Sequence, residues 1–231
     1  MDRPGKPLMC KGFEIINHFQ EFISPARVST YKSIAERDGV RWFDLYQWNI
    51  DASSALWRDL AIFEVVLRNS IDSRLRERFG REDWWAEFSE KFAQTEQAQL
   101  HRALHKGRGS IEAKFPVSLP DDVVANLSLG FWVRLLSGGG RAQYETLLWQ
   151  PTLRKAFAYY AGTRSQLFVQ TNGLRQLRNR IAHHEPILNR HLKKDVESIS
   201  RACGYVNPAL EKYLRNTSRV NEVLNQRPVR P

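Results

Sequence analysis

Arg178, Asn179 and His183 are the residues of this sequence whose types and spacing best fit chemistry. A guanidinium is a planar fork of donors for phosphate oxygens, an imidazole moves protons near neutral pH, and an amide can orient either group. In RNA the 2′-hydroxyl is an internal nucleophile, so cleavage needs a proton acceptor, a proton donor and stabilisation of developing charge, but no metal. His183 is therefore the predicted general acid or base, Arg178 the predicted binder of the phosphate, and Asn179 the orienting residue.

The segment around these three residues is predicted to be an amphipathic helix. Its apolar stripe recurs at three and four residues and consists of Leu174, Leu177 and Ile181. Asn179 and His183 are one turn apart and roughly opposite that stripe, whereas His184 projects beside it. The pattern thus favours His183 as the catalytic histidine. A structural interpretation stays open, because two histidines near a helix C-terminus also interact favourably with the helix dipole.

Several blocks of the sequence resemble one family. The segment from Arg178 to Pro186 is similar to the RN-x-x-AHH segment of the Abi-like (abortive infection) family of bacterial phage-defence proteins, a branch of the HEPN superfamily. Earlier blocks agree with that family in order and spacing, and these are Leu45-Tyr46-Gln47-Trp48-Asn49, Glu64-Val65-Val66-Leu67-Arg68-Asn69, Leu129-Gly130-Phe131-Trp132-Val133 and Leu148-Trp149. The resemblance spans residues 24 to 190.

The resemblance implies an all-helical protein that dimerises. Active members of that superfamily are metal-independent ribonucleases in which Arg-x4-6-His motifs from two subunits face each other, and here the motif is Arg178 with His183. One imidazole cannot stand on both sides of a phosphorus atom, so we expect a homodimer with a composite cleft. A neutralising antitoxin, either a protein or a small RNA, restrains some Abi-like relatives, although no residue here indicates one.

Glu64, Arg68 and Asp72 are spaced four residues apart and share one face of a predicted helix. They could form a ladder of compensating salt bridges, or they could line the same cleft as Arg178. The resemblance favours the cleft. The resemblance also implies that the catalytic residues are supported by Glu64, Arg68, Asn69 and His184.

The charge of the chain points to a polyanionic partner. Its net charge is +10, and from residue 164 to residue 231 thirteen Lys or Arg stand against five Asp or Glu. The motif therefore lies in the most basic part of the chain, which favours RNA as the ligand. The predicted RNA contacts around the motif are Arg175, Arg180, Arg190, Lys193 and Lys194.

Other features exclude several classes of protein. No apolar run approaches the length of a membrane span and no signal-peptide pattern is present, so we expect a cytoplasmic protein without membrane contact. Cys10 and Cys203 are too few for a disulfide framework and are predicted to be reduced thiols. His101 and His105 have a metal-ligand spacing but lack a third ligand, and are predicted to lie on the surface. We predict no metal and no cofactor.

The chain is predicted to fold as one all-α, multi-helix bundle of the HEPN type over residues 13–218. A flexible basic tail is expected at residues 1–12 and an Arg- and Pro-containing tail at 219–231. Predicted helices begin at Pro25 and continue as a short helix over 42–48, a core helix over 51–79, and helices over 84–106, 123–136, 142–148, 151–160, 163–185 and 189–202, with a last one from Pro208. Residues 107–122 are expected to form a loop that covers the site or connects helices.

These observations predict an endoribonuclease toxin of phage defence. Two alternatives stay open: a HEPN protein that binds RNA without cutting it, and a purely structural dimer module.

Overall fold

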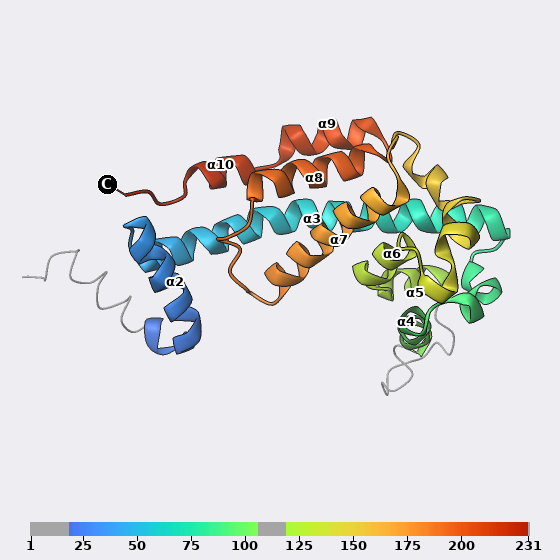
Figure 1. Ribbon diagram of the computed structural model, residues 1–231, viewed down its shortest axis with the longest axis horizontal. Helices are drawn as coiled ribbons and strands as arrows, with labels where there is room; N and C mark the ends of the chain where they lie inside the picture. Colours follow the sequence, from blue (N-terminus) through green and yellow to red (C-terminus); the bar gives the residue numbers. More distant parts are fainter. Residues whose placement is uncertain (1–18, 106–118, 231) are drawn as a thin grey trace, which may run out of the picture. The chain divides into compact units, whose positions relative to one another are not determined.

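The computed structural model describes residues 19–105 and 119–230, and within these ranges every regular element is a helix. The predicted all-α class is thereby confirmed for this part of the chain (Figure 1). None of the helices in these ranges combines the length and the apolar character that crossing a membrane requires. The chain divides into two compact units: residues 1–55 with 219–231, and residues 56–218.

Unit 1 contains α2 (Pro25–Asp38), the first part of α3 (Trp42–Phe79) and α10 (Val220–Asn225). Ser24 caps α2, which begins at Pro25 as predicted, and Gly39 ends it in a left-handed conformation. The indole Nε1 of Trp48 donates a hydrogen bond of 2.8 Å to the carbonyl oxygen of Val223. The segment 219–231 was predicted as a tail, but it begins with α10 and buries Val220. Residues 1–12 lie outside the described ranges.

Helix α3 is one continuous helix of 38 residues, where the sequence predicts a break between residues 48 and 51. The break is wrong because no glycine or proline interrupts the segment from Trp42 to Phe79. In unit 2 the predicted core positions of α3 are all buried, namely Leu56, Leu60, Phe63, Leu67, Ile71 and Leu75. This helix forms the apolar support of unit 2.

The middle of unit 2 is more broken than the sequence predicts. Two 3-10 turns (Trp84–Glu87 and Ser89–Lys91) precede α4 (Gln94–His105), and the single helix predicted over 123–136 is divided into α5 (Pro120–Asn126) and α6 (Leu129–Leu135). Ser128 separates the last two, because its side chain caps the backbone of α6. Short π- and 3-10 turns (Glu145–Trp149 and Leu153–Phe157) replace the helices predicted at 142–148 and 151–160.

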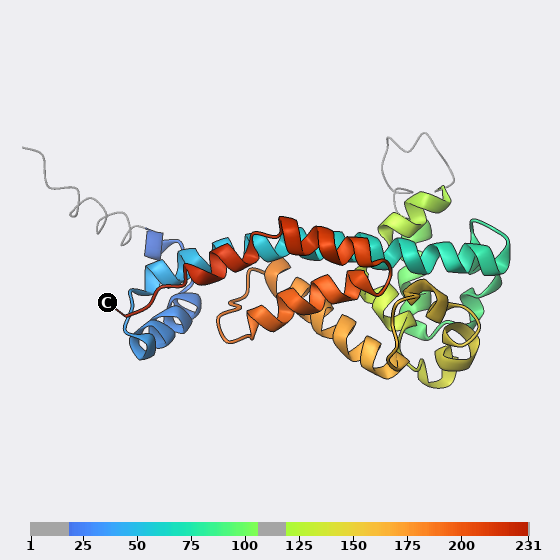
Figure 2. The same cartoon turned by 90° about the horizontal axis from the view of Figure 1, so that it is seen from above.

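Helices α7 (Arg164–Ala182), α8 (Leu192–Gly204) and α9 (Pro208–Thr217) complete unit 2. A capping box of Thr163 and Gln166 starts α7, and Asn207 caps α9. Figures 1 and 2 show α7 running back along α3 in the opposite direction, with its C-terminal half against that helix. Most of the predicted loop 107–122 lies outside the described ranges.

Candidate functional site

Arg178 lies between α7 and α3. Its Nε donates a hydrogen bond of 3.2 Å to Oε2 of Glu64, a residue 114 positions earlier in the chain. The guanidinium carbon also lies 5.4 Å above the ring centre of Trp57, which is two helical turns before Glu64 on the same face of α3. The side chains of Arg178 and Glu64 remain 31% and 23% exposed. Arg178 is therefore held from two sides while part of its surface stays open to solvent.

The bond to Glu64 uses only Nε of the arginine. Among the residues that the structure describes, none accepts a hydrogen bond from the two terminal nitrogens of Arg178. Because these nitrogens form the outer side of the fork, a phosphate can approach them without displacing Glu64.

His183 follows the last residue of α7 as its C-cap and is exposed. Its backbone N–H bonds to the carbonyl oxygen of Asn179 at 3.0 Å, so the chain still follows the helix up to this residue. Asn179 itself is half-buried. The imidazole thus lies on the surface about one turn beyond Arg178, as the helical pattern predicts.

His184 differs from the prediction that it lies beside the core stripe. It is exposed, and its φ of 55° is in the left-handed region that glycine usually occupies. The N–H of His184 bonds to the oxygen of Ile181, and the N–H of Glu185 bonds to the oxygen of Arg180. These two bonds form a Schellman motif, which ends the helix before His184 and turns its side chain away from the stripe.

The predicted salt-bridge ladder on α3 is not formed. Glu64 bonds to Arg178, Arg68 donates to Oδ1 of its neighbour Asn69 at 3.1 Å, and Asp72 pairs instead with Arg76. The structure therefore places Glu64 with the motif, and Arg68 one turn further along α3.

The five predicted RNA contacts differ in how their charges are paired. Arg180 pairs with Glu185 at 3.5 Å and Arg190 with Asp195 at 2.8 Å, so carboxylates already compensate both charges. Arg175 instead donates to the amide oxygen of Asn172 at 2.9 Å, and no carboxylate in the described part of the chain pairs with it. Lys193 and Lys194 lie in the first turn of α8, on exposed positions.

The residue of this site that sequence reasoning missed is Trp57. It is 41% exposed, which is unusual for a side chain with so much apolar surface. Its spacing of seven residues from Glu64 was a usable signal, since the two must share a face of α3.

Cys203 is a buried free thiol, and burial raises its pKa to about 12. It therefore takes no part in the candidate chemistry. Cys10 lies outside the described residues. His101 and His105 are exposed on α4, as predicted. Their rings are stacked, with centres 4.1 Å apart.

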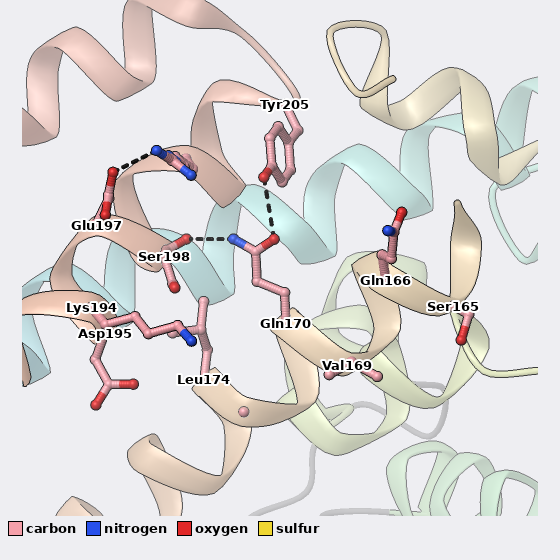
Figure 3. A pocket seen from close by; sticks show the side chains of 12 residues that line it. Ser165, Gln166, Val169, Gln170, Leu174, Lys194, Asp195, Glu197, Ser198 and Tyr205 are labelled. Carbon is pink, nitrogen blue, oxygen red and sulfur yellow. Dashed lines mark hydrogen bonds and ion pairs between the residues drawn. The ribbon is translucent and has the colours of Figure 1, made fainter. Parts of the chain in front are cut away.

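A hollow of about 590 Å³ lies between α7 and α8 (Figure 3). Gln170 crosses it, donating to the carbonyl oxygen of Ser198 at 3.1 Å and accepting from the hydroxyl of Tyr205 at 3.2 Å. Of the predicted site residues only Lys194 lines this hollow. It is on a different face of α7 from Arg178, so it is separate from the motif.

Comparisons with protein-family models, with curated proteins and with solved structures found no match.

Proposed function

We propose that this chain is a metal-independent endoribonuclease of the Abi-like HEPN type, acting as a toxin in bacterial phage defence. The supporting observation is the hydrogen bond between Arg178 and Glu64. These residues belong to two separate sequence blocks that resemble the family, and the fold brings them together with an exposed histidine beside them. If Glu64 belonged only to a salt-bridge ladder along α3, or if Arg178 were an ordinary surface charge, the two residues would have no need to pair.

In this proposal His183 moves the protons and Arg178 stabilises charge. A base at one side of the scissile phosphate takes the proton of the 2′-hydroxyl, whose oxygen attacks the phosphorus, and an acid at the other side protonates the leaving 5′-oxygen. The terminal nitrogens of Arg178 bind the non-bridging oxygens as their charge grows. Asn179 orients one of these groups. The products are a 2′,3′-cyclic phosphate and a 5′-hydroxyl.

Glu64 and Trp57 fix the guanidinium before RNA arrives. The carboxylate fixes Nε and the indole limits tilting, so less conformational freedom is lost when the phosphate binds. Glu64 is therefore a positioning residue in this mechanism.

A second copy of the chain supplies the second histidine. Trp57 and Val65 are 41% and 45% exposed on α3 next to the Arg178–Glu64 pair, and apolar surface of this kind suits a subunit contact. Across a two-fold axis this contact would bring two His183 residues toward one cleft. Mixing His183→Ala with Arg178→Ala protein should then give activity unlike that of either variant alone, whereas additive residual activity would indicate a one-chain site.

Cleavage of RNA by the purified protein in EDTA tests the proposal. We expect wild-type protein to leave cyclic phosphate ends, and His183→Ala to leave the RNA intact, while His101→Ala on exposed α4 cleaves normally. Activity that needs added magnesium or manganese would overturn the mechanism. RNA binding without cleavage by wild type would indicate the RNA-binding alternative, and absence of RNA affinity would indicate a structural dimer.

A further inference from the structure

A second polar hollow begins one turn of α3 beyond the Arg178–Glu64 pair. Its volume is about 370 Å³, in the range of small-ligand pockets. It is lined from α3 and α5 by Arg68, Asn69, Asp72, Arg76, Asp121, Val124 and Ala125. Glu64 and Arg68 are four residues apart, so the near end of the hollow lies about 6 Å along α3 from the Glu64 position.

The two ends of this hollow differ in charge. At the near end Arg68 bonds only to the neutral amide of Asn69, and no carboxylate of the described residues pairs with it. At the far end Arg76 lies 2.7 Å from carboxylate oxygens of both Asp72 and Asp121. The hollow is thus cationic beside the motif and acidic beyond it, where one arginine faces two carboxylates.

The acidic end contains groups that can read a base. Asp72 is buried and also accepts a hydrogen bond of 2.8 Å from the indole of Trp84, so its position is fixed. Asp121 is 87% exposed and accepts from Arg76 through Oδ1, so Oδ2 is available to accept from a ligand. A free carboxylate oxygen accepts from an amino group and repels a carbonyl oxygen.

We propose that this hollow is the subsite for the nucleotide next to the scissile phosphate, with Arg68 on its phosphate and Asp121 at its base. This inference rests on the proposed function, because it places a neighbouring nucleotide beside Arg178. It commits the site to single-stranded RNA, whose bases are free to enter a pocket. It also predicts that cytosine, which presents an amino group, binds better than uracil, which presents a carbonyl at the same position.

The test measures binding, so that it does not depend on cleavage. Fluorescence anisotropy with 2′-O-methyl oligocytidylate and oligouridylate would be compared for wild type, Arg68→Gln, Asp121→Asn and Arg74→Gln. Arg74 is the matched control, because it is on α3 as well but pairs with Glu77 at 2.6 Å. A thermal melt of each variant checks that it is folded.

Wild type should bind oligocytidylate about fivefold more tightly than oligouridylate. Arg68→Gln should weaken both about tenfold and lower the salt dependence by about one phosphate contact, while Arg74→Gln should change neither. Asp121→Asn should keep most of the affinity and lose the preference for cytosine.

Two results would overturn the inference in different ways. If wild type binds the oligonucleotides but Arg68→Gln and Asp121→Asn bind them as Arg74→Gln does, the subsite is wrong and the proposed function stands. If wild type binds neither oligonucleotide, the proposed function fails and the subsite fails with it.

Discussion

Two of the arginine–glutamate pairs that join helices of unit 2 are constructed differently. Glu96 is fully buried, and its two oxygens accept from Nε of Arg134 and from the hydroxyl of Tyr144, the latter at 3.0 Å. Glu64 remains partly exposed, and Arg178 meets it through a single bond. In the first pair both carboxylate oxygens accept hydrogen bonds and the carboxylate is buried, whereas in the second a partly exposed carboxylate accepts one bond from Arg178. The first arrangement is typical of a pair that supports the fold, and the second suits the proposed site.

The largest expected effect distinguishes the two glutamates by stability. Glu96→Gln should lower the free energy of unfolding by about 3 kcal/mol, because the amide that replaces the buried carboxylate cannot accept from both Arg134 and the buried hydroxyl of Tyr144. Glu64→Gln should lower it by less than about 1 kcal/mol, since its pair is partly solvated. Urea denaturation of the two variants measures both values. Equal losses would remove the distinction between the pairs.

The same comparison predicts opposite effects on RNA cleavage. Arg178→Ala should reduce the rate by about 10²- to 10³-fold, and Arg178→Lys should be nearly as damaging, because a point charge does not replace a planar fork. Arg134→Lys should leave the rate within about threefold of wild type, since it changes only the supporting pair. Single-turnover cleavage assays measure the rates. A fully active Arg178→Lys would show that only the charge matters.

A substitution at the end of α7 should have a smaller effect on the free energy of unfolding, and it should raise that energy. His184→Gly should stabilise the protein by about 1 kcal/mol, because glycine occupies the left-handed conformation without the cost that histidine bears. His184→Ala should not stabilise it, since alanine keeps that cost. Thermal melts compare the two. A loss of stability in His184→Gly would indicate that the imidazole contributes a contact.

The smallest effect concerns the pH dependence of stability at Asp72. Burial raises the pKa of this carboxyl above its usual value, against the lowering effects of Trp84 and Arg76. The unfolded chain therefore loses its proton first as pH rises, and the native state loses stability between the usual pKa and the raised one. Asp72→Asn has no such proton, so its stability relative to wild type should increase with pH across that interval. Urea midpoints from pH 3 to pH 7 test this; a constant difference would contradict it.

Local signals predicted the helix that holds the candidate site. The Thr163–Gln166 box and the Leu174, Leu177 and Ile181 stripe depend on neighbours in sequence, and both are formed as predicted. The all-α class followed from the same periodicities.

Contacts distant in sequence could not be predicted in this way. Nothing near Glu64 shows that its partner is Arg178 rather than Arg68, because both are arginines within reach of a carboxylate and only the crossing of α3 and α7 selects one. The turn at His184 was missed for another reason. A left-handed residue at the end of a helix is usually glycine or asparagine, and here histidine occupies that position.

The buried thiol of Cys203 gives unit 2 an internal reporter. With a pKa of about 12 it stays protonated and shielded in the native state, so an alkylating reagent reaches it only when α8 separates from its neighbours. In a chain with Cys10→Ser, the labelling rate would therefore measure the opening equilibrium of α8 in native buffer. A site variant that alters cleavage without altering this rate acts on the chemistry, and one that raises the rate has loosened the framework beside the motif.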